Sequence, residues 1–319
     1  MDNISFYYVY WDFAKDRNIR YNWHTLLLSI ICVKNVYPQS KVRIISYVNP
    51  TNEFKKLVDL CQVEIIYKNP AFVHKNGYIN CCHNSNGDCQ FLLSKPMDCY
   101  EVALEKNDNN VAICDIDYFL FRSFKNVDFS KVGVLYGDSS NPPPRVNTGL
   151  LLFGANQFNT QFFFRLYVQM LEAFNHQQKN IEETLKIPVY SSCQSLQEEI
   201  CISLIVKKYF ELNGLVFYNL TVGNHILYES MKNLDYSSNI HTAKLDKHRI
   251  VPVLLGSKKI SSYIAGLKNN AINDIFKIYQ KQSFSKEESF LQGLLDQQLP
   301  TCYEIKKDVS FTKSRKIFI

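Results

Sequence analysis

The chain has 319 residues, of which 46% are hydrophobic and 14% aromatic, and its formal net charge is +6 at pH 7. A chain of this length and composition can bury a substantial core, so we exclude intrinsic disorder and expect one large domain, or one domain with an appendage. Lysine and arginine are scattered along the sequence, which argues against a nucleic-acid-binding protein, although an anionic substrate would suit the mild positive charge.

The N-terminus shows no secretory signal, and no apolar stretch is long enough to span a bilayer, since the longest, 26–33, is interrupted by Ser29. We therefore expect a cytoplasmic protein without a transmembrane segment. Two interpretations of the basic tail at Lys313, Arg315 and Lys316 stay open: peripheral contact with an anionic membrane surface, or a solvated terminus.

The ten cysteines do not predict a disulfide framework, because the chain is long and shows no signal for secretion. Most lie in apolar contexts, where a free cysteine acts as a small hydrophobic residue, and this group includes Cys32, Cys61, Cys114 and Cys201. A polar stretch holds the group Cys81, Cys82, His83 and Cys89. It is interpreted either as a local zinc site or as a loop with reduced thiols, and no Cys-x-x-Cys pair supports the zinc site.

The first part of the chain alternates predicted strands and helices. A β-branched and aromatic run predicts a strand at 4–10, and apolar residues at helical intervals predict a helix at 23–36. A strand at 41–48, a helix at 52–61 and a strand at 63–67 follow. This βαβαβ order predicts a parallel sheet wrapped by helices.

The later elements are predicted in the same way, and no internal repeat is found. In chain order they are a loop or flap at 68–90, a helix at 92–106, strands at 131–136 and 146–153, and helices at 156–177 and 195–210. The pattern weakens after about residue 253.

One strand-like run ends in two carboxylates. Apolar residues or cysteine fill 111–114, Asp115, Ile116 and Asp117 follow, and aromatic residues or leucine fill 118–121. Alternate side chains of an extended chain share a face, so we expect Asp115 and Asp117 to project together from the end of a buried strand. Such an acidic pair suits a divalent cation, and nucleotides dock at strand ends in open α/β sheets. We interpret the segment as a clamp for a metal and a diphosphate; the alternative is a chance Asp-x-Asp in a turn.

The order of these motifs resembles the GT-A nucleotide-sugar glycosyltransferases, and most closely the family that includes glycogenin and bacterial lipopolysaccharide galactosyltransferases. The βαβαβ start, the Asp-x-Asp strand and a late histidine carry the resemblance, which covers roughly residues 1–255. It implies an α/β fold of GT-A type, Rossmann-like, with a mostly parallel central sheet flanked by helices. We expect a catalytic domain at 1–255, divided into a nucleotide-binding half at 1–117 and an acceptor-side half at 118–255, and a helical C-terminal extension with the basic tail at 256–319.

The resemblance implies that Asp115, Asp117 and His241 bind Mn²⁺ or Mg²⁺. In the family, a glycine three positions after the histidine precedes a lysine, six positions after it, that contacts the diphosphate. In this chain Lys244 stands at the position of the glycine, and Lys247 lies six positions after His241, as the family's lysine does. Both lysines are therefore candidates for a phosphate contact.

The resemblance also implies contacts with the nucleotide part of the donor. Tyr8 and Asp12 lie near the end of the first strand, where these enzymes hold the base and ribose. Lys95 is a candidate for the donor phosphates, and its alternative is a solvated lysine.

Two further segments match the family's sugar-side residues. Asn147 and Gly149, with Thr148 between them, match an Asn-x-Gly segment whose asparagine contacts the donor sugar, and the alternative is a simple strand-entry turn. An acidic cluster, Glu198 and Glu199, lies near the start of the predicted helix at 195–210. Glu199 aligns with the second aspartate of an Asp-Gln-Asp motif of the family, and Glu198 replaces its glutamine. The expected catalytic residues are thus Glu199, Glu198 and Asn147, although acidic residues also suit the start of a helix.

The implied function is metal-dependent transfer of a sugar from a nucleotide-sugar, expected to be a UDP-sugar, with retention of the anomeric configuration. The acceptor, whether glycan, protein or lipid, is not indicated. One alternative is a sugar nucleotidyltransferase, although its glycine-rich loop is absent from 11–17. Another is a non-catalytic nucleotide-sugar-binding protein of the same fold.

Overall fold

The computed structural model describes the chain at residues 3–11, 23–72, 89–116, 118–120, 123–124, 127–137, 146–176, 198, 201–202, 205, 215–220 and 239–241. The helices are α1 (Trp23–Val36), α2 (Asn52–Leu60), α3 (Cys89–Glu105) and α4 (Phe158–His176). The strands are β1 (Ile4–Tyr10), β2 (Val42–Ser46), β3 (Val63–Tyr67), β4 (Asn110–Cys114), β5 (Tyr118–Leu120), β6 (Val132–Gly137), β7 (Val146–Gly154), β8 (Leu215–Leu220) and β9 (Asn239–His241).

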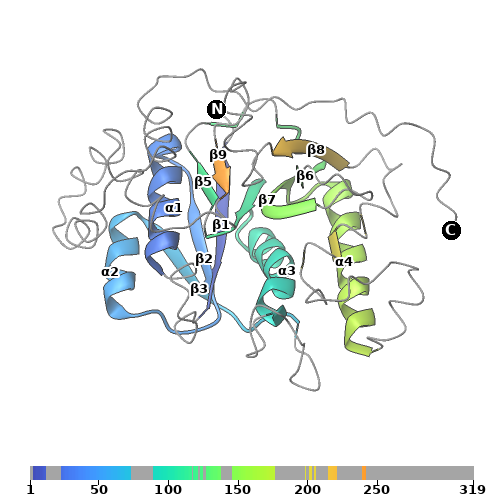
Figure 1. Ribbon diagram of the computed structural model, residues 1–319, viewed down its shortest axis with the longest axis horizontal. Helices are drawn as coiled ribbons and strands as arrows, with labels where there is room; N and C mark the ends of the chain where they lie inside the picture. The colour runs from blue at the N-terminus through green and yellow to red at the C-terminus, as the bar shows by residue number, and fades with distance from the viewer. Residues whose placement is uncertain are drawn as a thin grey trace, which may run out of the picture.

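A seven-stranded sheet forms the centre of the described structure, in the order β3-β2-β1-β4-β7-β6-β8 (Figure 1). Strands β1 to β4 are mutually parallel, and β6 is parallel to β8. Strand β7 is antiparallel to both of its neighbours, β4 and β6, so it alone runs against the other six strands. The predicted fold class, an α/β protein with a mostly parallel central sheet flanked by helices, is confirmed.

The two faces of the sheet bury separate hydrophobic clusters, because successive side chains of a strand point to opposite faces. Phe6, Tyr8 and Tyr10 of β1 pack into the cluster that includes α1 and α2. Tyr7 and Val9 pack into the cluster that includes α3 and α4. Figure 1 shows the corresponding separation of the two helix pairs. With both faces covered, β1 is buried throughout its length, as central strands of α/β proteins are.

The observed bounds agree closely with the predicted ones in the first part of the chain. Strands β1 and β3 and helix α1 have the predicted limits. Helix α2 begins after Thr51, whose side-chain oxygen accepts a hydrogen bond from Phe54 N at 3.2 Å, as an N-cap residue does. Helix α3 begins at Cys89, so the last two residues of the predicted loop at 68–90 are helical instead.

The carboxylate-bearing segment differs from the prediction. Strand β4 ends at Cys114, and the N–H of Tyr118 donates to the carbonyl of Asp115 at 3.0 Å, which closes a turn. The expectation of an extended chain through Asp115 is therefore wrong. The apolar residues after this turn form β5, which leaves the large sheet and pairs with β9. The turn forms because β5 buries its side chains against the α1 face.

The predicted roles of the cysteines receive a partial answer. The described thiols are buried and form no disulfide, as expected for small hydrophobic residues; they are Cys32, Cys61, Cys99, Cys114 and Cys201. Burial raises the pKa of Cys61 to about 11. The zinc hypothesis for Cys81, Cys82, His83 and the Cys89 side chain concerns groups outside the described part of the chain, as does the predicted extension at 256–319.

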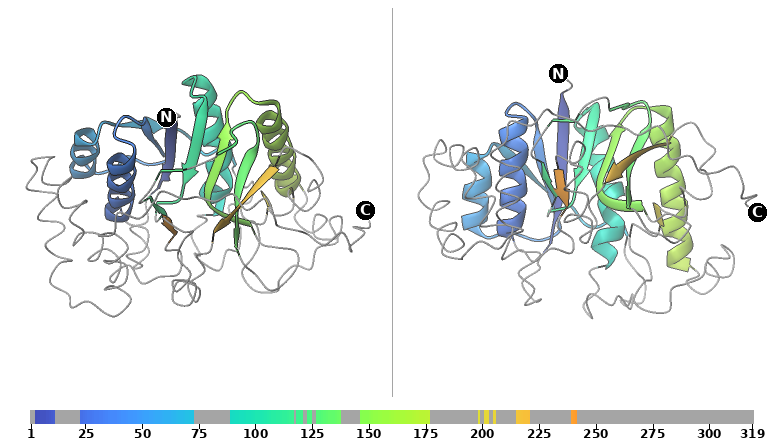
Figure 2. Two further views of the ribbon diagram at one scale, coloured as in Figure 1. Left: turned by 90° about the horizontal axis from the view of Figure 1, so that it is seen from above. Right: turned by 45° about the horizontal axis from the view of Figure 1, so that its top comes forward.

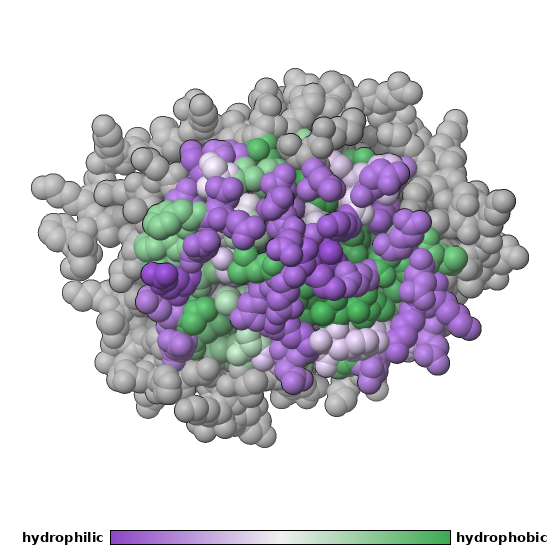
Figure 3. Space-filling view, turned by 180° about the vertical axis from the view of Figure 1, so that it is seen from behind, coloured by the Kyte–Doolittle hydropathy of each residue, from purple (hydrophilic) through white to green (hydrophobic). Residues whose placement is uncertain are grey.

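The described surface exposes few large hydrophobic side chains, and these are Leu60, Tyr67, Leu104 and Phe158. On the face seen in Figure 3, hydrophilic residues lie between the smaller hydrophobic areas. Among the described helices, none combines the length and apolar character that crossing a membrane requires.

Candidate functional site

The candidate site lies where β4 ends and β7 begins. These strands are antiparallel, with Cys114 opposite Leu150, so the start of β7 reaches the carboxyl end of β4. The N–H of Asp115 donates to the carbonyl oxygen of Gly149 at 2.9 Å. The topology thus joins two segments, Asp115 and the Asn147–Gly149 stretch, that the sequence analysis selected separately.

A lysine from the helix face completes this cluster. Lys95 of α3 donates from Nζ to Asp115 Oδ1 at 2.5 Å and to the Thr148 carbonyl oxygen at 3.3 Å. The same Nζ lies 2.9 Å from Glu198 Oε1. Thr148 Oγ1 also donates to Glu198 Oε1, at 3.1 Å. Lys95 therefore contacts three other residues that were selected from the sequence, Asp115, Thr148 and Glu198.

Burial differs among the charged members of this cluster. The side chains of Lys95 and Glu198 are 3% and 5% exposed, whereas that of Asp115 is 25% exposed. Burial by itself lowers the pKa of Lys95, but the negative charges of Asp115 and Glu198 raise it by more, so the net shift is upward. Lys95 is consequently a cation at neutral pH, and Asp115 is the member of the cluster that faces solvent.

The two-stranded sheet brings the late histidine to the same region. Strand β9 lies beside β5 (Figure 2). In the register of this pair, His241 stands opposite Tyr118. Tyr118 follows Asp117 directly and closes the turn with Asp115. The backbone of His241 is therefore adjacent to the Asp-x-Asp segment, although more than a hundred residues separate them in sequence.

Of the three predicted metal ligands, the Asp115 carboxylate is the one whose side chain the structure describes. Carboxylate oxygens suit Mg²⁺ and Mn²⁺, and an imidazole suits transition metals. Among the side chains that the structure describes, no group of three or more His, Cys, Asp or Glu residues is arranged to hold a metal. The Asp117 side chain and the His241 imidazole, two of the three predicted ligands, lie outside that part of the chain.

Tyr8 lies beneath the site, in the core. Its side chain is fully buried, and its hydroxyl oxygen lies 2.9 Å from Ser29 Oγ in a hydrogen bond. Ser29 Oγ in turn donates to the carbonyl of Tyr118 at 2.5 Å. Burial raises the pKa of Tyr8, so its phenol is neutral. The described contacts of Tyr8 therefore support the strand that follows the Asp-x-Asp segment. Ile116 is likewise buried, in the hydrophobic cluster on the side of α1 and α2.

Aromatic residues that the sequence analysis did not select line the neighbouring strand ends. Trp11 follows β1 and Tyr47 follows β2, and the ring of Phe91 from α3 stacks on both, with centroid distances of 5.6 Å and 5.1 Å. Their positions in the sequence could have indicated them, since Trp11 and Tyr47 each come directly after a buried parallel strand.

The remaining predicted site residues lie outside the described residues, and these are Asp12, Asp117, Glu199, Lys244 and Lys247. For Asn147 and His241 the described part is the backbone.

Solved structures of glycosyltransferases resemble this chain. The galactosyltransferase LgtC, in complex with donor and acceptor sugar analogues, has 12% identity and a TM-score of 0.46, over 83% of this chain and 96% of that one. Mouse xyloside xylosyltransferase 1 in its apo form has 12% identity and a TM-score of 0.46, over 75% and 97%. Core-mannan synthase A from Aspergillus fumigatus, in an Mn/GDP form, has 11% identity and a TM-score of 0.43, over 68% and 73%.

These structures belong to the class of protein that the sequence resemblance predicts. At this level of identity and overlap, the likeness assigns no activity and no residue role to this chain. No protein-family model and no curated protein matches the sequence.

Proposed function

We propose that the chain is a metal-dependent glycosyltransferase of GT-A type. It transfers a sugar from a nucleotide-sugar, with a UDP-sugar as the expected donor, to a glycan, protein or lipid acceptor, and it retains the anomeric configuration. The observation that carries this proposal is the meeting of Asp115, Lys95 and the His241 strand at one edge of the sheet. In open α/β sheets this edge, at the carboxyl ends of the strands, is where nucleotides bind.

Asp115, Asp117 and His241 would hold the cation. Support comes from the partial exposure of the Asp115 carboxylate and from the pairing of His241 with the residue after Asp117. A bound Mn²⁺ or Mg²⁺ supplies a Lewis acid that stabilises the negative charge on a leaving diphosphate.

Three lysines are proposed to stabilise the diphosphate in addition to the metal. Lys95 is held as an ammonium group at the strand edge, where the charge of a departing nucleoside diphosphate would develop. Lys244 and Lys247 follow β9 in sequence and are proposed as further phosphate contacts. A preorganised cation lowers the barrier because it needs no rearrangement as the charge develops.

The sugar side of the site is proposed to involve the start of β7 and the acidic cluster. The carbonyl oxygen of Gly149 accepts a hydrogen bond from the N–H of Asp115, and Asn147 lies two residues earlier. Asn147 is therefore a candidate for a contact with the donor sugar. Glu199 follows the buried Glu198 and is proposed as the carboxylate that stabilises positive charge on the sugar. A cytoplasmic location is also part of the proposal; for the basic tail, peripheral contact with an anionic membrane and a solvated terminus both stay open.

A panel of nucleotide-sugars tests this function. The purified chain is incubated with each donor in the presence of Mn²⁺ or of a chelator, and release of the nucleoside diphosphate is measured. We expect release from one donor with Mn²⁺ alone, and its loss in Asp117→Ala and His241→Ala. Asp59→Asn, which alters an exposed carboxylate of α2, is the control and retains activity.

Other outcomes identify the alternatives. Release of pyrophosphate from a nucleoside triphosphate and a sugar phosphate would identify a sugar nucleotidyltransferase. Binding of a nucleotide-sugar without turnover of any donor would identify a non-catalytic binding protein.

A further inference from the structure

Glu198 gives Lys95 a second negative partner beside Asp115. One ammonium group, Lys95 Nζ, lies within 2.9 Å of both carboxylates, and the three groups together carry a net charge of −1. Burying the Glu198 carboxylate carries a large desolvation cost, and the Lys95 ammonium group, 2.9 Å away, offsets part of it.

The location of Glu198 indicates that it remains with Lys95 when Asp115 changes partner. Glu198 is 5% exposed, and it also accepts a hydrogen bond from Thr148 Oγ1 at 3.1 Å, so it is held from two sides. Asp115 is 25% exposed at the end of β4. The solvent-facing carboxylate is the one that an incoming cation can reach.

We infer that Glu198 is a positioning residue that neutralises Lys95 while Asp115 binds a divalent cation, and that it thereby sets the cation affinity of the site. This inference rests on the cation site in the proposed function. Without Glu198, a cation arriving at Asp115 would compete directly with the Lys95 ammonium group for the same carboxylate, and the two positive charges would repel. With Glu198 present, Lys95 keeps an anionic partner at hydrogen-bonding distance.

This role predicts opposite signs for two substitutions. Glu198→Gln keeps the shape and the Thr148 contact but removes the compensating charge, and we expect it to weaken Mn²⁺ binding by about 10-fold to 100-fold, as for other groups that act behind a metal ligand. Lys95→Met removes the competing cation and tightens Mn²⁺ binding. In the double variant both effects cancel, and affinity returns to within about threefold of wild type.

The test is a titration of the full chain with Mn²⁺ alone, followed by electron paramagnetic resonance of the free ion, so that no turnover is needed. Glu101→Gln is the matched control. Lys68 is likewise shared by two carboxylates of α3, at 2.5 Å from Glu101 Oε2 and 3.6 Å from Asp98 Oδ1. Loss of charge there leaves Mn²⁺ affinity unchanged.

The outcomes separate this inference from the proposed function. If wild type binds no Mn²⁺, or if Asp117→Ala binds it equally well, the cation site itself is wrong. If wild type binds Mn²⁺ and Glu198→Gln binds it equally tightly, only the role of Glu198 is overturned. Should Glu198→Gln not fold, the double variant decides, because it contains neither buried charge; weakening by tenfold or more in that variant would count against charge compensation.

Discussion

Strand β4 has an aspartate near each end, and the two aspartates have different surroundings. Asp108 precedes the strand and Asp115 follows it. Asp108 has no exposed side-chain surface, whereas Asp115 is 25% exposed. Both are paired with cations, so pairing alone does not distinguish a structural carboxylate from a functional one. What distinguishes them is whether a ligand can reach the oxygen atoms.

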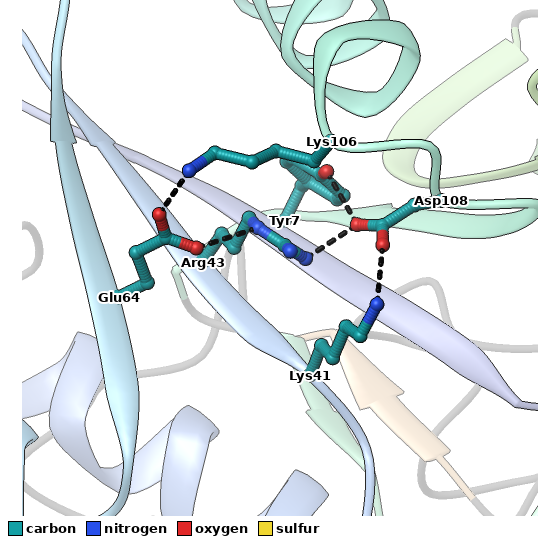
Figure 4. Close-up of polar contacts among 6 residues, drawn as sticks. All are labelled: Tyr7, Lys41, Arg43, Glu64, Lys106 and Asp108. Atoms are coloured by element: carbon teal, nitrogen blue, oxygen red, sulfur yellow. Dashed lines mark hydrogen bonds and ion pairs between the residues drawn. The ribbon is translucent and has the colours of Figure 1, made fainter.

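Figure 4 shows the polar contacts of the cluster around Asp108, whose own side chain has no exposed surface. Tyr7 donates to Asp108 Oδ2 at 2.7 Å, Arg43 also pairs with that oxygen, and Lys41 Nζ lies 3.2 Å from Oδ1. Arg43 reaches in addition to Glu64 on β3, at 2.9 Å. The cluster therefore ties β1, β2 and β3 to the segment that leads into β4.

The cluster around Asp115 connects fewer elements of the sheet and is open on one side. Its lysine and its second carboxylate are buried, and its aspartate faces solvent. This arrangement leaves one charged group of the cluster partly exposed. The comparison predicts that stability depends mainly on Asp108 and that activity depends mainly on Asp115.

The largest expected effect on stability comes from Asp108→Asn. The substitution removes the fully buried anionic partner of Arg43 and leaves this arginine only Glu64, which is 43% exposed. Breaking a buried ion pair on one side costs about 3–5 kcal/mol. Urea denaturation measures the free energy of unfolding. A loss below about 1 kcal/mol, the range of surface ion pairs, would show that this cluster does not hold the strands.

The matched substitution Asp115→Asn should have the opposite profile. We expect sugar transfer to fall by about 100-fold or more. The substitution removes a carboxylate that is proposed to hold the cation, and the cation would stabilise the charge on the leaving diphosphate. Stability should fall by only about 1 kcal/mol, since Lys95 retains Glu198. Measuring both unfolding and nucleoside diphosphate release for this variant checks the expected changes in stability and in activity. Equal loss of stability in the two Asn variants would remove the distinction between the clusters.

An intermediate effect is expected for Tyr7→Phe. This substitution removes the phenol that donates to Asp108 Oδ2 and leaves the ring packing in place. Burial raises the pKa of Tyr7, and the hydrogen bond to the Asp108 carboxylate raises it further, so the phenol is a neutral donor throughout the physiological range. Loss of a hydrogen bond to a charged group costs about 2 kcal/mol in the free energy of unfolding. Tyr100→Phe, at a buried tyrosine of the same hydrophobic cluster, is the comparison, and a similar cost there would argue against a special role for the Asp108 contact.

The smallest effect is expected for Glu64→Gln at the exposed margin of the Asp108 cluster. Partial burial raises the pKa of Glu64, but the hydrogen bond from Lys106 and the charge of Arg43 lower it by more, so its net shift is downward. A depressed carboxyl pKa stabilises the fold above the ordinary value of 4.5, and this contribution is lost as the pH falls through the folded-state pKa.

With Glu64 43% exposed, solvent screening limits its contribution to about 0–1 kcal/mol at neutral pH. Unfolding of wild type and Glu64→Gln should therefore differ slightly at neutral pH and converge in acid. A difference that grows as the pH falls would contradict the direction of this shift.

Much of the strand and helix pattern was readable from the sequence, because local periodicity reflects burial on one or two faces. The continuous apolar character of 4–10 and the helical spacing of 23–36 gave strand β1 and helix α1 with their observed limits. The carboxylates after β4 were identified because charged residues rarely interrupt an apolar run without a partner. The turn that separates β4 from β5 was missed, since the same apolar pattern continues on both sides of it.

The contacts that give these side chains their roles were not readable in the same way. Tyr7, Arg43, Glu64 and Asp108 are each unremarkable in their local sequence, and only the parallel pairing of β1, β2 and β3 brings the first three together. Likewise, the sequence indicated Glu198 either as a catalytic residue or as a charge suited to the start of a helix, and its position 2.9 Å from Lys95 is visible only in the structure.

The sequence by itself determined the fold class and the position of the candidate acidic pair, because both follow from patterns within a few neighbouring residues. The tertiary structure decided which cations meet which carboxylates, and it set β9 beside β5, so that His241 stands across from Tyr118. Such pairings depend on strand order and register. Those are set by how whole elements pack together, and a local pattern carries no information about them.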